Sequence, residues 1–400
     1  MTVYLADKLP DSAVEDLKKL GLDVQSEPQT TSADLDKGLA SAQILIVRST
    51  VVSGFCIENS PNLSLIIRAG AGVNNIDMVA ASNFGIYVAN CPGKNAIAVA
   101  ELTMALILGL DRFIGDNVSD FRSGIWNKGT FSKAEGLFGK RLGIIGTGKI
   151  GQEVISRAQA FGMEVVAWSR SLTDEMAEEM EIERAESVFD VAKKADVLSV
   201  HLAMNPHTKG IISKEILSTL KDGSFFINTS RAGVVDEEAL IAELKSGRLK
   251  AGLDVFSDEP EFKQGEFSSR LQGVPNLYIT HHIGASTQQA QNAVADDAVD
   301  IVRGYVQTGE VRNWMNRLHQ TEAPWQLVVR HYDKPGVIAN VMSELKHANI
   351  NAQELTNVIF EGGTTACCTI QIDTEPDEEI LKSIRTRQDE VISATLIARS

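Results

Sequence analysis

A glycine-rich turn near residue 150 constrains the fold more than any other segment. The apolar run Arg141–Ile145 leads into Gly146-Thr147-Gly148-Lys149-Ile150-Gly151, and a helical pattern follows. In such a turn the first glycine permits the tight bend, the second admits a phosphate close to the backbone, and the third lets the helix pack closely. Free N–H groups at the helix start attract an anion. The segment predicts a dinucleotide site, with an ordinary strand-to-helix turn as the alternative.

Short apolar runs alternate with helical patterns on both sides of this turn. Apolar strands separated by helices indicate parallel sheets covered on both faces. A chain of 400 residues is too long for a single hydrophobic core, so more than one domain is expected. We expect one doubly wound lobe from residues 1–95 and a six-stranded one from 96–285, both of Rossmann/flavodoxin-like α/β type. A helix within 286–316 is expected to return and complete the first lobe. After a polar linker at 317–323, residues 325–400 follow the element order of a ferredoxin-like α+β module.

The net charge of −15 limits what the chain can bind. We expect neither nucleic acid nor an anionic membrane as a partner, so any bound anion must be held by local arginines and lysines. No apolar run is long enough for a bilayer, and the N-terminus lacks a signal-peptide pattern. The four cysteines have no C-x-x-C spacing and no histidines beside them, which argues against a metal site and favours a reducing cytoplasm.

Three polar residues follow the last three apolar runs of the second lobe, namely Arg231, Glu259 and His282. The carboxyl ends of parallel strands meet at one edge, so these residues are expected to line a cleft between the lobes. Oxidising a secondary alcohol with a nicotinamide needs a base, a cation for a carboxylate or oxyanion, and a group that tunes the base. Each residue alone would suit a solvated loop, but three at successive strand ends favour a catalytic set.

In these motifs the chain resembles the D-2-hydroxyacid dehydrogenase family. The resemblance covers almost all of residues 1–315, from Val47–Thr50 and Arg68–Asp77 through the glycine turn to His282–Gly284. The segment from about Trp325 resembles an ACT domain, which implies an appended regulatory module.

The resemblance also implies a role for each candidate catalytic residue. It assigns proton transfer to His282, support of the imidazole to Glu259, and the substrate carboxylate and carbonyl to Arg231. A carboxylate beside His282 favours the imidazolium form, which agrees with this assignment. The family usually has proline at the position of His281, so we expect His281 to fill space or tune charge.

The cofactor half of the resemblance leaves two questions open. Asp254 resembles the residue that holds the nicotinamide carboxamide, with a satisfied turn aspartate as the alternative. Ser169-Arg170 stands where a carboxylate would bind the ribose hydroxyls, so we expect NAD with NADP as a second cofactor. Alternatively, Arg170 stacks on adenine or faces solvent while Ser169 bonds the NAD ribose. The expected cofactor residues are Gly146, Gly148, Lys149, Ile150, Gly151, Ser169, Arg170, His201, Thr229, Asp254 and Gly284.

Arg48 and Arg68, each at the end of an apolar run, resemble phosphate- and carboxylate-binding residues of the family. Two arginines in a chain of negative charge suit a small anionic 2-hydroxy acid, with surface ion pairs as the alternative. The expected substrate residues are Arg48, Arg68, Gly70, Gly72 and Asn74.

His331, Asp333 and Asn349 resemble positions at which paired ACT domains bind an amino acid. The resemblance suggests L-serine as an effector, and a pairing module without a ligand is the alternative. We expect a single helix from Asn95 to about Phe121. Its apolar part, from Asn95 to Leu110, and the terminal module both favour self-association as a homodimer or homotetramer.

The resemblance implies NAD(P)-dependent oxidation of D-3-phosphoglycerate to 3-phosphohydroxypyruvate, the first step of L-serine biosynthesis. A reductase of hydroxypyruvate, glyoxylate or another D-2-hydroxy acid is the alternative enzyme. A non-enzymatic dinucleotide-sensing scaffold on the same fold is a third interpretation, and the complete catalytic set argues against it.

Overall fold

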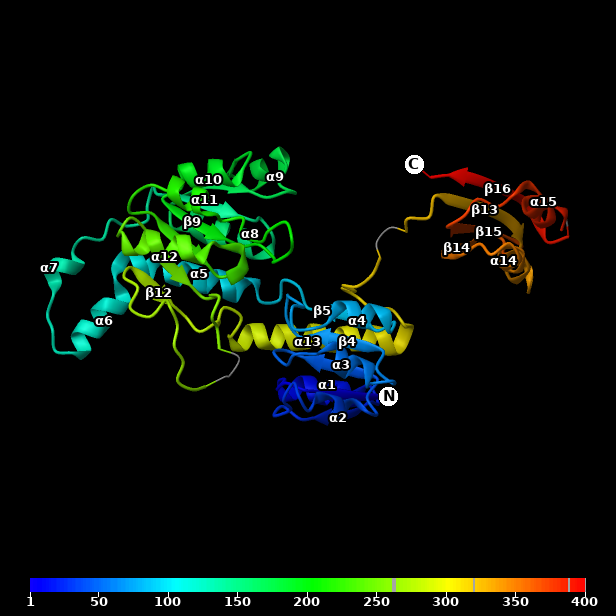
Figure 1. The fold of residues 1–400 in the computed structure, drawn as a ribbon, viewed down its shortest axis with the longest axis horizontal. Coiled ribbons are helices and arrows are strands. Elements are labelled where there is room, and N and C mark those ends of the chain that lie inside the picture. The colour runs from blue at the N-terminus through cyan, green and yellow to red at the C-terminus, as the bar shows by residue number, and fades with distance from the viewer. Residues whose placement is uncertain (261–263, 319–320, 388, 400) are drawn as a thin grey trace. The chain divides into compact units, whose positions relative to one another are not determined.

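Three sheets form the framework of the chain. The computed structural model describes residues 1–260, 264–318, 321–387 and 389–399, so residues 319–320 of the predicted linker lie outside it. The chain divides into two compact units, 1–316 and 317–400. The first contains a five-stranded and a seven-stranded sheet, and the second a four-stranded sheet (Figure 1). The predicted fold class is confirmed.

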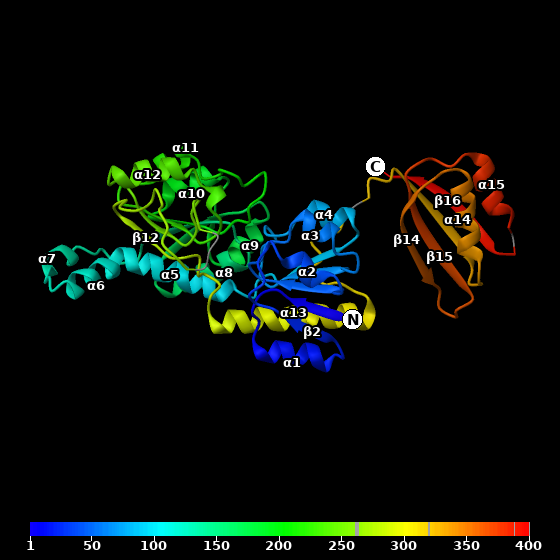
Figure 2. The same ribbon diagram turned by 60° about the horizontal axis from the view of Figure 1, so that its bottom comes forward.

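The first sheet is parallel and has the strand order β2-β1-β3-β4-β5. Every residue of its central strand is buried, because helices cover both faces. Val294, Ala298 and Ile301 of α13 (Gln288–Thr308) join the core on one face of this sheet, so a distant segment completes the lobe (Figure 2). The elements before α5 are β1 (Thr2–Leu5), α1 (Asp11–Lys19), β2 (Asp23–Ser26), α2 (Leu35–Leu39), β3 (Ile44–Val47), α3 (Gly54–Glu58), β4 (Leu65–Arg68), α4 (Met78–Asn83) and β5 (Tyr87–Asn90).

The second sheet is also parallel, in the order β12-β11-β10-β9-β6-β7-β8. The strand order reverses beside β6, which is where doubly wound folds bind ligands. The prediction of six strands missed β8, which has two residues and therefore no apolar run. The elements are β6 (Arg141–Ile145), α8 (Lys149–Ala160), β7 (Glu164–Trp168), α9 (Asp174–Glu179), β8 (Glu183–Arg184), α10 (Val188–Lys194), β9 (Val197–Val200), α11 (Lys214–Thr219), β10 (Phe225–Asn228), η1 (Ala232–Val234), α12 (Glu237–Lys245), β11 (Lys250–Leu253) and β12 (Leu277–Ile279).

The single helix predicted after residue 95 is wrong, because the chain forms two. α5 (Ala96–Arg112) and α6 (Ile114–Arg122) meet at Phe113, whose left-handed φ of 54° interrupts the helix. α5 packs against α8, β10 and β11. Neither α6 nor α7 (Lys128–Phe131) has a buried residue, and both project from the lobe in Figures 1 and 2. None of the helices described has the length and hydropathy to cross a membrane.

The second unit is an antiparallel sheet with two helices. Its elements are β13 (Trp325–Tyr332), α14 (Val337–His347), β14 (Ala352–Ile359), β15 (Thr365–Ile372), α15 (Glu378–Thr386) and β16 (Val391–Ala398). The strand order β14-β15-β13-β16 leaves β14 and β16 at the edges. This βαββαβ order is the predicted ferredoxin-like arrangement.

Candidate active site

The glycine turn has the backbone that a phosphate site requires. Gly146 has φ 100°, and a Cβ there would lie 2.5 Å from the carbonyl oxygen of His201. A Cβ on Gly151 would collide with the carbonyl oxygen of Gly146, so glycine lets α8 approach the turn. Gly148 caps α8, and open space surrounds its Cβ position. The first N–H groups of α8 have no partner within the helix and can therefore bind an anion.

Buried polar atoms beside this turn fit a dinucleotide. In the described chain, Oγ1 of Thr147 and Nδ1 of His201 are buried and have no hydrogen-bond partner. Nε2 of His201 lies 2.9 Å from Oγ of Ser199, and burial lowers the pKa of His201 to about 3, so the ring is neutral. Buried polar atoms rarely stay unpaired in proteins, which supports a polar ligand over the turn.

The other predicted cofactor residues begin α8 or follow strands of the same sheet. Lys149 and Ile150 open α8. Thr229 follows β10, and its Oγ1 lies 3.0 Å from Oγ1 of Thr103, so contact between Thr229 and the cofactor stays a prediction. At the end of β7, Gly146 N donates to the carbonyl of Trp168 at 2.8 Å.

Ser169 and Arg170 follow β7 and stand beside the glycine turn, where the adenosine ribose is expected. Ser169 is half-buried and Arg170 is exposed. Among the residues described, no carboxylate forms an ion pair with Arg170, so its charge is available to a ligand.

His282 and Glu259 form a hydrogen-bonded pair. Nδ1 of His282 lies 2.7 Å from Oε2 of Glu259, and Oε1 of Glu259 accepts the N–H of Phe256 at 2.9 Å. The His282 side chain is 51% exposed, and no described residue bonds its Nε2. With Nδ1–H donated to the carboxylate, Nε2 is left as the proton acceptor. The His281 side chain bonds to none of the described residues, which supports the choice of His282.

Asp254 holds the loop that carries His282. Its Oδ1 accepts from Oγ1 of Thr280 at 2.6 Å and from N of Ile283 at 2.8 Å, and its Oδ2 accepts from N of Gly284 at 2.8 Å. Asp254 is buried, so these bonds compensate the desolvation of its charge. This contact set matches the alternative of a satisfied turn aspartate, and contact with the nicotinamide stays a prediction.

Arg231 is fixed at the end of β10. Nδ2 of Asn228 donates to the carbonyl of Arg231 at 2.9 Å, and Nη1 of Arg231 donates to the carbonyl of Ser230 at 2.6 Å. A Cβ on Gly72 would lie 2.5 Å from Nη2 of Arg231. The guanidinium therefore reaches the 70–74 loop of the first lobe.

Three arginines from both lobes gather near this contact. Burial and the charges of Arg231 and Arg48 lower the pKa of Arg68 to about 10, and burial lowers the pKa of Arg231. Nε of Arg68 is buried without a partner. The negative charges of Asp7 and Glu259 act in the opposite direction on Arg68 and Arg231, but burial outweighs them. Positive charges held together in this way indicate an anion site.

The remaining substrate candidates surround the arginines. Gly70 packs against the guanidinium of Arg68, with no room for a Cβ, and Asn74 is exposed beside Gly72. The sequence predictions missed Asp7, whose Oδ2 accepts the N–H groups of Arg48, Ser49 and Thr50 at 2.7, 2.9 and 3.0 Å. Burial opposes its ionisation, but these bonds hold the pKa of Asp7 below its usual value. Asp7 follows β1 as Arg48 follows β3, and this shared place at the carboxyl ends of parallel strands could have predicted the contact.

The three effector candidates do not meet within one copy. His331 is buried, with Nδ1 2.7 Å from the carbonyl of Tyr332 and Nε2 3.0 Å from Oδ1 of Asn357. Asp333 precedes α14 and Asn349 follows it, so the helix separates them by about 16 Å. A site that uses both residues therefore requires two modules.

Known proteins are similar to this chain in sequence and in fold. A family model described as "D-isomer specific 2-hydroxyacid dehydrogenase, NAD binding domain" matches residues 104–284. D-3-phosphoglycerate dehydrogenase of Methanocaldococcus jannaschii is 32% identical across 100% of this chain and 74% of its own. Hydroxypyruvate reductase of Thermotoga maritima is 40% identical across 74% of this chain and 96% of its own. The NAD⁺-bound structure of 3-phosphoglycerate dehydrogenase from Entamoeba histolytica superposes with a TM-score of 0.67 at 26% identity, over 80% of this chain and 99% of that one. The chain therefore belongs to the D-2-hydroxyacid dehydrogenase family, and its second lobe is an NAD-binding domain.

Proposed function

We propose that the chain oxidises D-3-phosphoglycerate to 3-phosphohydroxypyruvate with NAD, the first step of L-serine biosynthesis. The observation that carries this proposal is the cluster of Arg48, Arg68 and Arg231 beside the His282–Glu259 pair. The substrate has a carboxylate and a phosphate, and both are anionic groups that arginines bind well. The M. jannaschii relative, aligned along the whole chain, bears the name of this activity.

The residues divide the chemistry between them. Nε2 of His282 takes the proton of the C2 hydroxyl, while Glu259 stabilises the imidazolium through Nδ1. Arg231 holds the carboxylate and the carbonyl oxygen that forms at C2. Arg48 and Arg68 hold the phosphate. The glycine turn and the start of α8 would hold the pyrophosphate of NAD, and bound NAD would supply the hydride acceptor for C2.

Steady-state kinetics with a panel of D-2-hydroxy acids tests the proposal. We expect the highest kcat/KM for 3-phosphoglycerate and a much lower value for D-glycerate, which differs only by the phosphate. The 40% identity to the T. maritima hydroxypyruvate reductase makes hydroxypyruvate the second candidate substrate. A higher kcat/KM for unphosphorylated substrates would favour that reductase activity and contradict the phosphate site.

For the cofactor, we propose that Arg170 allows the NAD-binding lobe to use NADP as well. A 2′-phosphate needs a cation and no competing carboxylate at the end of β7. The exposed Arg170, with no ion-pair partner among the described residues, supports this proposal.

We further propose that the chain works as a homodimer or homotetramer. The apolar side chains of α5 are largely buried within its own lobe. On α6, Ile114, Val118 and Phe121 form an exposed apolar stripe at i, i+4 and i+7. A second copy is the partner that would cover it.

We propose three functional regions: a substrate lobe of residues 1–95 plus 286–316, an NAD lobe of 96–285, and an ACT domain of 325–400 that binds L-serine between paired copies. The placement of Asp333 and Asn349 at opposite ends of α14 supports a shared site. The four cysteines are free thiols, which supports a cytoplasmic location.

A further inference from the structure

We propose that Glu237 and Arg270 form a brace that positions Glu259, and through it His282, for proton transfer. The inference rests on the proposed function of the His282–Glu259 pair. Neither residue of the brace contacts the pair directly, so both are positioning residues.

Glu259 lies on a segment with no regular secondary structure. After β11 ends at Leu253, residues 254–260 form turns and irregular backbone. A hydrogen bond made from such a loop keeps its geometry only if other contacts fix the backbone. The bond from the N–H of Phe256 fixes the Glu259 carboxylate against its own loop, but it does not anchor that loop to the lobe.

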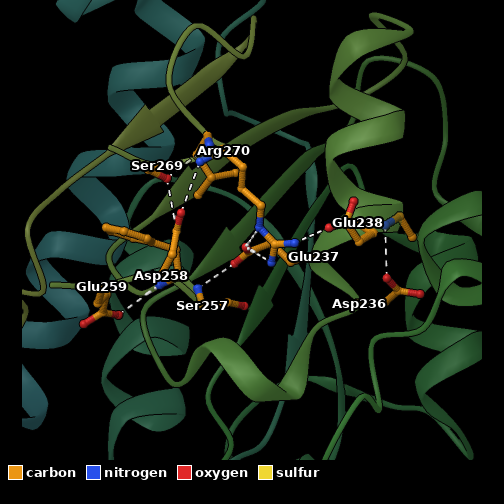
Figure 3. Close-up of polar contacts among 11 residues, drawn as sticks. Asp236, Glu237, Glu238, Ser257, Asp258, Glu259, Ser269 and Arg270 are labelled. Carbon is orange, nitrogen blue, oxygen red and sulfur yellow. Dashed lines mark hydrogen bonds and ion pairs between the residues drawn. The ribbon is translucent and has the colours of Figure 1, made fainter. Parts of the chain in front are cut away.

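Glu237 supplies the first anchor. The N–H of Ser257 donates to Oε2 of Glu237 at 2.8 Å, and Oε1 accepts from Nε and Nη2 of Arg270 at 3.1 and 2.6 Å (Figure 3). Glu237 is only 7% exposed. A carboxylate buried to this extent is costly unless it is paired, so the guanidinium offsets the cost of its burial and holds it in place.

Arg270 and its neighbour supply the second anchor. Oδ1 of Asp258 accepts from Oγ of Ser269 at 3.0 Å, and Oδ2 accepts from the backbone N of Arg270 at 3.1 Å. Arg270 thus holds Asp258 through its backbone and Ser257 through Glu237. The two residues that directly precede Glu259 are both tied to the brace, as Figure 3 shows.

The brace also connects the proton-transfer pair to the substrate cation. Glu237 is the first residue of α12, and only η1 and its flanking residues separate it from Arg231. One short segment therefore has Arg231 at its start and the anchor of the Glu259 loop at its end. The bond between Ser257 and Glu237 therefore keeps the His282–Glu259 pair in a fixed position relative to Arg231, which is proposed to bind the substrate carboxylate.

Substitution of Glu237 by glutamine tests the brace. Glu237→Gln keeps the shape, removes the charge that pairs with Arg270, and weakens the acceptor for Ser257. We expect kcat to fall about 10- to 100-fold, the cost of a small misplacement of catalytic groups, with the KM for 3-phosphoglycerate and the affinity for NADH within about twofold. The Arg270 side chain is 42% exposed, so Arg270→Gln is a milder second variant with the same expected pattern.

A double-mutant cycle separates positioning from general stability. Adding Glu237→Gln to Glu259→Gln should lower kcat little further, because the brace acts through Glu259. The control is Glu243→Gln on the same helix. This substitution breaks the 2.6 Å ion pair between Glu243 and Arg248, and the Glu243 side chain is 19% exposed. That pair does not contact the Glu259 loop, so kcat should stay unchanged even if the melting temperature falls.

The ¹⁵N and ¹H signals of His282 Nδ1, assigned with His282→Ala, give a readout that needs no turnover. Glu237→Gln should shift them toward the values of Glu259→Gln. Unchanged signals, an equal loss of kcat with and without Glu259, or an equal loss in Glu243→Gln would overturn the brace. Failure of the wild-type chain to turn over 3-phosphoglycerate would contradict the proposed function, and the Nδ1 signals would still decide the brace.

Discussion

Replacing Arg68 by methionine should stabilise the ligand-free chain while impairing substrate binding. Burial and two neighbouring arginines lower the pKa of Arg68 to about 10. Each pKa unit corresponds to about 1.4 kcal/mol, so keeping Arg68 charged at pH 7 costs the folded state up to about 3 kcal/mol. This cost applies fully below pH 10 and is relieved as the pH rises further, because folding weakens proton binding by this group. Methionine retains much of the aliphatic stem, so we expect a gain of about 1–2 kcal/mol at pH 7.

Thermal unfolding and kinetics on the same preparations check both halves of this prediction. The melting temperature of ligand-free Arg68→Met should rise by about 2–5 °C, and the KM for 3-phosphoglycerate should rise about 10- to 100-fold. Arg157→Met is the control, because Arg157 forms an ordinary helix ion pair with Glu153 at 2.6 Å. That variant should leave KM unchanged and should not raise the melting temperature. A lower melting temperature in Arg68→Met with an unchanged KM would refute the reasoning.

Three further predictions follow from the other groups. His282→Ala should lower turnover about 10²- to 10⁴-fold and leave NADH affinity, measured by fluorescence titration, within about twofold; unchanged turnover would remove the mechanism. Arg170→Ala should lower kcat/KM with NADP about tenfold and change that with NAD little, whereas a strong wild-type preference for NAD that the variant does not alter would rule out the NADP role. Calorimetry should show heat on L-serine binding that Asn349→Ala abolishes, and the absence of heat and of inhibition would leave a pairing module without a ligand.

Features set by local sequence were predictable, whereas long-range contacts were not. The glycine turn is local chemistry, since the conformations of Gly146 and Gly151 follow from residue type and spacing. The break at Phe113 is not, because a left-handed phenylalanine carries no signal in composition or periodicity. The sequence prediction missed β8 for a related reason, since a strand of two residues is too short to show an alternating pattern.

The same distinction holds within the site. The place of His282 and Glu259 after strands predicted that both line the cleft, and the family resemblance implied that they pair. The structure joins them at 2.7 Å. Asp7 and Glu237 were missed because each acts on backbone N–H groups that are distant in sequence, and such acceptors leave no motif. His331 was expected in the effector site, but both of its ring nitrogens lie within hydrogen-bonding distance of acceptors in its own unit.

The ratio of kcat/KM for D-3-phosphoglycerate to that for D-glycerate, with NAD, tests the central claim most directly. The two substrates differ only by the phosphate that Arg48 and Arg68 are proposed to bind. We predict a ratio of about 10² or more in the wild-type chain, reduced at least tenfold in Arg68→Met. A ratio near one, or one that Arg68→Met leaves unchanged, would contradict a phosphorylated substrate at the arginine cluster.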